Sequence, residues 1–346
     1  MKRFEGFQKG VNLGGWLSQC VSHDKAHFDG FITEKDIKDI KSMGLDHVRV
    51  PVDYDVFMNE SPDGDTVNEE GMAHIDDCIG WCRDNGLNMI LDLHKAKGYM
   101  FDANEVKDSD RFFTDKDLQE VFYKTWEMFA DRYGKYNDML AFELLNEVVN
   151  PDYESEWNEI AETVVERIRR IAPDSYIIVG GVNYNNVLCV SGIKVTGIDK
   201  LVYNFHCYEP LCFTHQKAHW VEGMTNDFEM WYPATLEEMR QKSEGFPQTH
   251  MGAVYNKCME GDGTFFDKMF ADAIDYAKKN DVPLYCGEYG VIDLAPLPDT
   301  LAWMKDINAS FEKFGIGRAL WNYKNKDFGL VDDHYAPIRD ELIKAL

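Results

Sequence analysis

Short apolar runs alternate with amphipathic helical patterns along almost the whole chain. We count eight such runs, at residues 10–13, 47–50, 89–94, 141–147, 176–180, 201–206, 282–288 and 318–321. Continuous apolar runs of this length are typical of parallel strands that are buried on both faces. Eight strand–helix units are the number that closes a barrel, so the sequence predicts an α/β fold, a (β/α)8 TIM barrel.

Helical periodicity separates most of these runs. The pattern predicts helices at residues 34–43, 70–85, 117–133, 155–171 and 299–314, and a last one near the carboxyl terminus. Residues 183–199 show no clean helical period, so the fifth unit is weak. Because no linker or repeat divides the chain, we expect residues 1–346 to form a single domain.

The region after the sixth run is too long for an ordinary connection. Residues 209–263 contain six large aromatic residues: Trp220, Phe228, Trp231, Tyr232, Phe246 and Tyr255. We interpret this region as a subdomain inserted at the carboxyl ends of the strands, where barrels of this type carry their active sites. The alternative is a packed subdomain without a role in ligand binding.

The composition limits the classes of partner. A formal net charge of -25 disfavours binding to nucleic acid or to an anionic membrane. No run approaches the roughly 20 apolar residues that span a bilayer. The amino terminus lacks the apolar stretch of a signal peptide, so we expect a cytoplasmic protein as the sequence is written, or a secreted one if a leader has been removed. We also expect a monomer.

The eight cysteines do not suggest a metal site. Cys78 and Cys82 are one helical turn apart, but no second pair with zinc-ligand spacing accompanies them. We therefore expect them to be reduced thiols in the core. No His-x-His pair points to a metal-dependent barrel hydrolase either, and we expect neither a metal nor an organic cofactor.

Polar and aromatic residues stand where the predicted strands end. They are Asn12, Arg49, His94, Asn146, Glu147, His206, Tyr208, Glu288 and Trp321. A single histidine or tryptophan of this kind is more often structural, but eight independent strands ending in such residues favour a common site. Two glutamates at this end of a barrel are what glycoside hydrolysis requires, one as proton donor and one as nucleophile.

The two glutamates need different environments. Glu147 must hold its proton at working pH, which requires a raised pKa, whereas Glu288 must stay ionised. Arg49 and Tyr208 could stabilise the charge of Glu288 by donating hydrogen bonds to it. His206 is a candidate to adjust the pKa of Glu147.

The remaining strand-end residues are candidates for contacts with a sugar. Asn146 precedes the acid and is placed to bond the sugar 2-hydroxyl. His94 could bind sugar hydroxyls, and Trp321 could offer its aromatic face to the apolar side of a pyranose ring.

With these residues the chain resembles glycoside hydrolase family 5 (clan A), the retaining (β/α)8 glycosidases with two catalytic glutamates. The likeness rests on Asn146–Glu147, on Glu288 within Cys-Gly-Glu-Tyr-Gly, and on the segments around Arg49, His94, His206, Tyr208 and Trp321, and it covers nearly the whole chain. One departure is that Lys95-Ala96-Lys97-Gly98 follows His94, where many members have a second histidine or a proline-containing turn.

This resemblance implies a cellulase-type enzyme, a retaining endo-β-1,4-glucanase acting on β-glucan polysaccharides or oligosaccharides. A β-mannanase, a xylanase or a β-1,3-glucanase of the same family is the alternative, and a non-catalytic glycan-binding barrel is a further one that the two intact glutamates disfavour. Five more residues are candidate substrate contacts: Asn12, Trp16, His219, Trp220 and Lys324.

Overall fold

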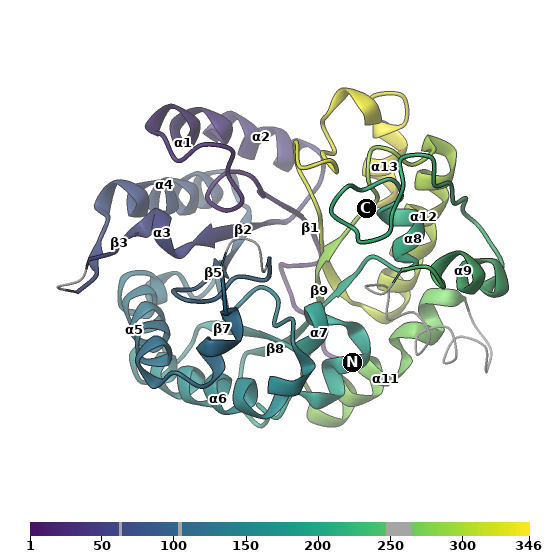
Figure 1. Cartoon of the computed structure of the whole chain (residues 1–346). Coiled ribbons are helices and arrows are strands. Elements are labelled where there is room, and N and C mark those ends of the chain that lie inside the picture. The colour runs from purple at the N-terminus through teal and green to yellow at the C-terminus, as the bar shows by residue number, and fades with distance from the viewer. Residues whose placement is uncertain (62–63, 103–105, 247–263) are drawn as a thin grey trace.

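The computed structural model describes residues 1–61, 64–102, 106–246 and 264–346, and its centre is a closed barrel of eight parallel strands (Figure 1). The strands are β1 (Lys9–Asn12), β2 (His47–Asp53), β5 (Asn88–Lys95), β6 (Leu140–Glu143), β7 (Tyr176–Gly180), β8 (Leu201–Cys207), β9 (Leu284–Tyr289) and β10 (Gly317–Leu320). Each of the eight predicted runs overlaps one of these strands. The predicted TIM barrel is therefore confirmed.

Helices surround the barrel (Figure 1). The longer ones are α2 (Glu34–Ser42), α4 (Glu69–Asn85), α5 (Lys116–Tyr133), α6 (Glu154–Ile171), α11 (Phe265–Asn280) and α12 (Leu297–Phe314), and α13 (Arg339–Ala345) ends the chain. The helices that we predicted are confirmed to within about two residues at each end, as boundaries read from sequence allow. Several helices were missed, among them α11 and the shorter α1 (Lys25–Phe31).

Shorter elements connect the barrel units. They are α3 (Tyr54–Phe57), the hairpin β3 (Met58–Asn59) and β4 (Thr66–Val67), α7 (Val182–Asn185), α8 (Leu211–Thr214), α9 (Leu236–Ser243) and the 3-10 helices η1 (Ser109–Phe113), η2 (Gly134–Tyr136), η3 (Pro151–Tyr153), η4 (Val187–Gly192) and η6 (Asp333–Tyr335). The weak fifth unit consists of α7 and η4, as the lack of helical periodicity predicted.

Local sequence explains where the main helices begin and end. Thr33 and Asp36 form a reciprocal capping box at the start of α2. Gly86 and Gly315 end α4 and α12 in the left-handed conformation, which glycine adopts without a steric penalty. Asp299 lies within the first turn of α12, and its carboxylate accepts the backbone N–H of Tyr232 at 3.0 Å.

Apolar side chains fill the amino-terminal end of the barrel. Phe4 and Phe7 are stacked with ring centroids 4.1 Å apart, and they pack against buried residues of the strands such as Ile90 and Tyr285. This plug closes one end of the barrel with the amino-terminal segment. Most of the buried polar side chains of the strands, among them His94, Glu143 and Glu288, lie toward the opposite, carboxyl-terminal end.

The region inserted after β8 contains both buried and exposed aromatic side chains. Tyr232 and Phe246 are buried, and the Tyr232 hydroxyl donates to Asp306 Oδ2 of α12 at 2.8 Å, which agrees with the packing alternative for these two residues. Trp220 and Trp231 are 44% and 45% exposed. Tyr255, a further predicted member of the insertion, lies outside the described residues.

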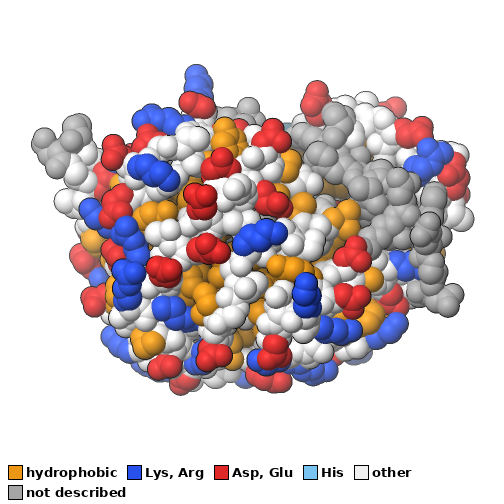
Figure 2. Space-filling view, turned by 90° about the horizontal axis from the view of Figure 1, so that it is seen from below, with side chains coloured by type: hydrophobic (Ala, Val, Ile, Leu, Met, Phe, Trp, Pro, Cys, Tyr) orange, Lys and Arg blue, Asp and Glu red, His pale blue; other side chains and the backbone are white. Residues whose placement is uncertain are grey.

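The distribution of charged side chains on the surface and the state of two cysteines can be compared with the sequence analysis. Figure 2 shows acidic side chains interspersed with basic ones over the face seen from below. Cys78 and Cys82 are buried free thiols in α4, as predicted. Among the helices of the described residues, none is both long and apolar enough to span a bilayer.

Candidate active site

Glu147 and Glu288 face one another at the carboxyl-terminal end of the barrel. Glu147 lies four residues beyond the end of β6, and Glu288 lies within β9. A carboxylate oxygen of each lies within 4.8 Å of the other. Retaining glycosidases hold their carboxyl groups about 5–5.5 Å apart and inverting ones about 6.5–9.5 Å apart. The two carboxyl groups of this barrel therefore approach more closely than those of an inverting pair.

Arg49 binds Glu288 from the interior of the barrel. Its guanidinium is fully buried, and Nη1 donates to Glu288 Oε1 at 2.8 Å. On its other edge, Nε and Nη2 donate to the two oxygens of Glu143 at 2.7 and 2.9 Å. Nη2 also lies 3.0 Å from Asp92 Oδ2. Because a guanidinium is rigid and planar, this arrangement fixes the position of Glu288 as well as its charge.

Tyr208 completes the environment of Glu288 by donating its hydroxyl to Oε2 at 2.9 Å. Burial raises the pKa of Glu288, but the charge of Arg49 and the bond from Tyr208 act in the opposite direction. Burial, and then the neighbouring charge of Glu288, raise the pKa of Glu147 well above its usual range. Glu147 is therefore the member of the pair that holds the proton at neutral pH.

His206 lies between the two glutamates and bonds to Glu147. Its Nδ1 is 2.7 Å from Glu147 Oε1, and the amide nitrogens of Asn185 and Asn204 both lie 3.5 Å from its Nε2. Since an amide nitrogen only donates, Nε2 accepts and the ring proton sits on Nδ1. Burial lowers the pKa of His206, so the ring is neutral. It donates to Oε1, and Oε2 of Glu147 is left to carry the transferable proton.

His94 and Trp321 form one wall of the site. Their rings are stacked, with centroids 5.9 Å apart and planes 10° apart. His94 Nδ1 bonds Asp92 Oδ2 at 2.7 Å, and burial lowers the pKa of His94 to about 4, so it is neutral. A Cβ on Gly14 would lie 2.6 Å from the Trp321 ring, so only glycine allows the chain to pass this close.

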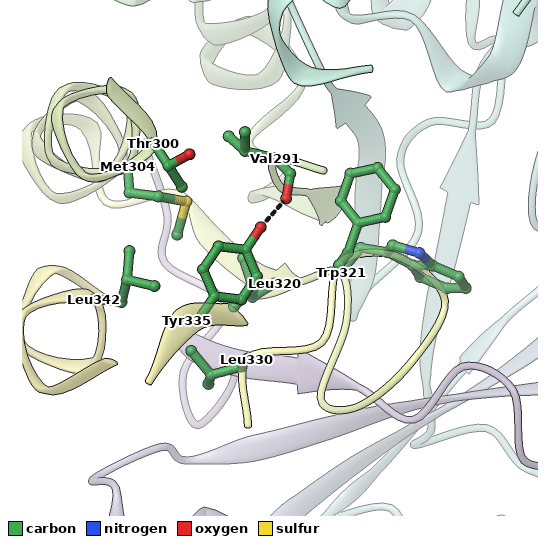
Figure 3. A pocket seen from close by; sticks show the side chains of 9 residues that line it. Val291, Thr300, Met304, Leu320, Trp321, Leu330, Tyr335 and Leu342 are labelled. Atoms are coloured by element: carbon green, nitrogen blue, oxygen red, sulfur yellow. Dashed lines mark hydrogen bonds between the residues drawn. The ribbon is translucent and has the colours of Figure 1, made fainter. Parts of the chain in front are cut away.

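A small cavity lies behind Trp321. It is lined mainly by apolar side chains, among them Val291, Met304 and Leu342, and the Tyr335 hydroxyl donates to the Val291 carbonyl beside it (Figure 3). Its volume is about 10 Å³, which is space for one water molecule and not for a sugar. The cavity therefore belongs to the packing that supports Trp321.

Two of the predicted substrate contacts are wrong. Asn12 has no exposed surface: its Oδ1 accepts from Arg49 Nη1 at 2.9 Å, and its Nδ2 donates to the Gly287 carbonyl at 2.9 Å. Trp16 is also fully buried, is stacked on Trp81, and donates its indole N–H to the Phe28 carbonyl. Asn12 therefore positions Arg49, and Trp16 belongs to the core.

The other three predicted contacts lie nearer to the surface. Lys324 is paired with Asp36 at 2.9 Å, which holds its ammonium group near α2. His219 and Trp220 are exposed, and their rings pack edge to face with centroids 4.9 Å apart. Trp220 also contacts His215, whose ring packs edge to face on Tyr208 at 4.9 Å. Trp220 is thus two ring contacts from a residue that bonds Glu288.

Sequence reasoning missed two buried carboxylates that contact Arg49 inside the barrel. Asp92 and Glu143 are paired across β5 and β6, and both are fully buried around Arg49. Burial raises the pKa of each to about 7. The signal was present in the sequence, because each is a charged residue inside an apolar run. Asp92 also stands two positions before His94, and alternate residues of a strand share a face.

Glu147, His206 and Glu288 form a group, within the described part of the chain, whose donor atoms are close enough to hold a metal ion. Each of these groups is already bonded, however. His206 Nδ1 bonds Glu147, and the two oxygens of Glu288 accept from Arg49 and Tyr208. This pattern fits transfer of a proton between carboxylates and a substrate.

Comparison with known proteins agrees with this geometry. A family model described as cellulase (glycosyl hydrolase family 5) matches residues 7–327. The chain is 38% identical over 341 residues to endoglucanase C of Acetivibrio thermocellus, with 98% of each chain covered. It is 41% identical over 318 residues to cellodextrinase A of Ruminococcus flavefaciens, covering 92% of this chain and 86% of the relative.

Solved structures share the fold. One is the cellulose synthase subunit Z of Clostridioides difficile, at 27% identity and a TM-score of 0.75, with 98% of this chain and 99% of that one covered. Another is a hyperthermophilic endo-β-1,4-glucanase in complex with substrate, at 23% identity and a TM-score of 0.76, with 98% and 97% covered. Since the family model spans most of the sequence and a relative is 38% identical over nearly its whole length, the chain belongs to glycosyl hydrolase family 5, the cellulase family.

Proposed function

We propose that this protein is a retaining endo-β-1,4-glucanase that hydrolyses β-glucans. The observation that carries this proposal is the pair Glu147 and Glu288, whose oxygens lie within 4.8 Å at the open end of the barrel. The two carboxyl groups differ in their partners, since only Glu288 bonds an arginine. One group is thereby suited to donate a proton and the other to attack.

In the first step, Glu288 attacks the anomeric carbon while Glu147 protonates the glycosidic oxygen. The bond from the anomeric carbon to the leaving sugar breaks, and a glycosyl ester with Glu288 forms. Arg49 Nη1 and Tyr208 hold the Glu288 oxygens before the attack, so little reorganisation is needed. Asn146 Oδ1 accepts from Arg49 at 2.8 Å, which orients the amide with Nδ2 as donor for the sugar 2-hydroxyl.

In the second step, Glu147 is a carboxylate and acts as a base. It takes a proton from water, the water attacks the anomeric carbon, and Glu288 leaves. Formation of the ester has neutralised Glu288 by then, which removes one of the charges that raise the pKa of Glu147. The pKa of Glu147 therefore falls between the two steps, as its change from acid to base requires.

The substrate class rests on the relatives. Endoglucanase C and cellodextrinase A are named for activity on cellulose-like chains and on short oligosaccharides of them, and both cover most of this sequence. These names support β-1,4-glucan as substrate over mannan, xylan or β-1,3-glucan. They leave open whether polymers or soluble oligosaccharides are cleaved faster.

Product analysis tests the proposal. We expect barley β-glucan, carboxymethylcellulose and cellopentaose to be cleaved with little activity on xylan or mannan, and proton NMR at early times to show the β-anomer as first product. First release of the α-anomer would contradict the retaining mechanism. Faster cleavage of mannan or xylan than of any β-glucan would contradict the substrate assignment.

A further inference from the structure

Two buried side-chain amides face the ring nitrogen of His206 that does not bond Glu147. Asn204 belongs to β8, two positions before His206, and alternate residues of a strand share a face. Asn185 follows β7 and has a left-handed backbone with a φ of 52°. Asn204 has no exposed surface, Asn185 is 1% exposed, and the nitrogen of each amide lies 3.5 Å from His206 Nε2. Neither amide takes part in the reaction steps described above.

The orientation of the Asn204 amide is determined by its other partners. The backbone N–H of Gly287, which can only donate, bonds Asn204 Oδ1 at 2.8 Å. On the opposite edge, Asn204 Nδ2 donates to Glu143 Oε1 at 2.8 Å. Exchanging the oxygen and the nitrogen would break both bonds, so the second hydrogen of Nδ2 is the one that faces His206.

The Asn185 amide is oriented by different contacts. Its Nδ2 donates to the Asn146 carbonyl, which can only accept. A Cβ on Gly180 would lie 2.1 Å from Asn185 Oδ1, so a glycine at the end of β7 leaves room for the oxygen of this amide. The two amides are thus held by unrelated parts of the chain, yet both present an N–H edge to the same ring nitrogen.

This arrangement leaves one neutral form of the His206 ring without a conflict. Burial, Arg49 and His94 all lower the pKa of His206, so the ring carries a single proton. A proton on Nε2 would point at two amide N–H groups and would be a buried donor without an acceptor. A proton on Nδ1 is donated to Glu147 Oε1 at 2.7 Å, and Nε2 then accepts from the amides.

Several charged or titratable groups surround His206 and Glu147. They are Arg49, Asp92, His94, Glu143 and Glu288. The nearest of the carboxylates to the ring, apart from Glu147, is Glu288, whose Oε2 lies 3.8 Å from His206 Nδ1. This carboxylate lies on the Nδ1 side, so it too favours a proton on Nδ1 over one on Nε2.

We propose that Asn185 and Asn204 are positioning residues that fix the proton of His206 on Nδ1, and that this tautomer directs the acidic proton of Glu147 toward the substrate. The inference rests on the proposed glucanase function. With Nδ1 protonated, Glu147 Oε1 accepts from the ring, so the carboxyl proton sits on Oε2. With Nε2 protonated, Nδ1 would accept the proton of Glu147, which would then point at the ring and not at the glycosidic oxygen.

Nitrogen-15 NMR of the wild-type protein labelled at histidine measures the tautomer directly, because protonated and unprotonated ring nitrogens have well-separated chemical shifts. The signals of His206 are identified by their loss in His206→Asn. We expect Nδ1 to be protonated and Nε2 to be unprotonated at pH 7. A proton on Nε2, alone or together with one on Nδ1, would overturn the inference.

The variant Asn204→Asp tests the consequence for catalysis. It keeps an oxygen toward Gly287 and replaces the N–H that faces His206 by a carboxylate oxygen, so Nε2 gains a proton in place of Nδ1 or in addition to it. In the first case the Glu147 proton turns toward the ring, and in the second the positive ring lowers the pKa of Glu147. Both cases remove the acid at pH 7.

Two substrates separate loss of the acid from loss of the fold of the site. Cellopentaose needs a proton on its leaving sugar, whereas 2,4-dinitrophenyl β-cellobioside releases an activated phenol that needs none. We expect Asn204→Asp to lower kcat/KM about 10²-fold on cellopentaose and less than about threefold on the aryl glycoside, since general acid catalysis contributes at least this much. Thermal unfolding reports whether the variant folds.

The control is Asn308→Asp, which introduces the same charge at a buried amide of α12. Asn308 is 2% exposed, and its Oδ1 accepts from Arg318 Nε at 2.9 Å. This variant should behave as wild type on both substrates.

Other outcomes overturn the inference. Equal losses on both substrates would mean that Asn204 only supports the nucleophile through Gly287, and an unchanged kcat/KM on cellopentaose would mean that the acid does not depend on this amide. If Asn204→Asp does not fold, Asn185→Asp places a carboxylate at the same ring nitrogen and is judged by the same two substrates. If neither folds, the wild-type spectrum decides. A wild-type protein that cleaves neither substrate would overturn the proposed function, whereas the spectrum would still report the tautomer.

Discussion

Replacing Tyr208 by phenylalanine removes one hydroxyl group and keeps the ring, so it isolates the bond to the nucleophile. The hydroxyl donates to Glu288 Oε2 at 2.9 Å. A hydrogen bond to a charged group contributes about 1.5–3 kcal/mol. One pKa unit corresponds to about 1.4 kcal/mol, so the loss is worth about 1–2 units. Because the bond favours the ionised form, its removal raises the pKa of Glu288.

The pH dependence of kcat/KM measures this shift. The acidic limb reports protonation of the nucleophile in the free enzyme, and the basic limb reports loss of the proton from Glu147. We expect Tyr208→Phe to move the acidic limb upward by about 1–2 pH units and the basic limb by less. Activity should therefore fall steeply at pH 5 and modestly at pH 7.

A matched control removes the same type of bond away from the reaction. The Tyr232 hydroxyl donates to Asp306 Oδ2 at 2.8 Å, so Tyr232→Phe loses an equivalent contact in the inserted region. Its pH profile should coincide with that of the wild type. If Tyr208→Phe lowers kcat/KM equally at all pH values without moving the acidic limb, Tyr208 acts by shape alone and the electrostatic reasoning fails.

Four further substitutions test other parts of the site. Glu147→Gln and Glu288→Ala should each lower the rate on β-glucan at least about 10³-fold with unchanged circular dichroism, and near-normal turnover by either would refute the assignment. Arg49→Lys should lower kcat about 10²-fold because one ammonium group does not replace the fork that holds Glu288 and Glu143, and kinetics at saturating substrate check this. Trp220→Ala should raise KM on oligosaccharides, whereas an unchanged KM would assign Trp220 to packing.

The barrel could be predicted because its signal is local and repeated. Each strand is an apolar run bounded by turn residues, and eight repeats leave few alternative folds. The partners of the glutamates followed from the same rule, since carboxyl ends of parallel strands meet at one end. Arg49, Tyr208 and His206 bond Glu288 and Glu147 as the sequence indicated.

The predicted substrate contacts were wrong where the sequence does not determine which way a side chain points. Asn12 ends β1, but its amide faces Arg49 and the neighbouring backbone within the barrel. Trp16 comes from a turn whose path the sequence does not specify, and it packs into the core on Trp81. The sequence also did not predict a pocket beside Glu147. The loops after β5, β6 and β7 build this pocket, and Asn183 and Tyr184 in one of its walls have left-handed backbones.

The buried carboxylates oppose folding while they serve the site. Burial raises the pKa of Glu143 from 4.5 to about 7, which corresponds to about 3 kcal/mol. A carboxyl whose pKa is higher in the folded state stabilises the fold at low pH, and this contribution is lost as pH rises from about 4 to about 7. Asp92 follows the same rule, also with a pKa of about 7.

Glu143→Gln should therefore flatten the fall of Tm between pH 5 and pH 8, since glutamine does not titrate and keeps the shape of the side chain. It should also loosen Arg49, whose Nε and Nη2 bond both Glu143 oxygens, and so reduce activity at every pH. Calorimetry and kinetics on the same variant measure the two effects. A Tm that falls as steeply as that of the wild type would show that Glu143 stays ionised in the folded protein, with Arg49 outweighing the cost of burial.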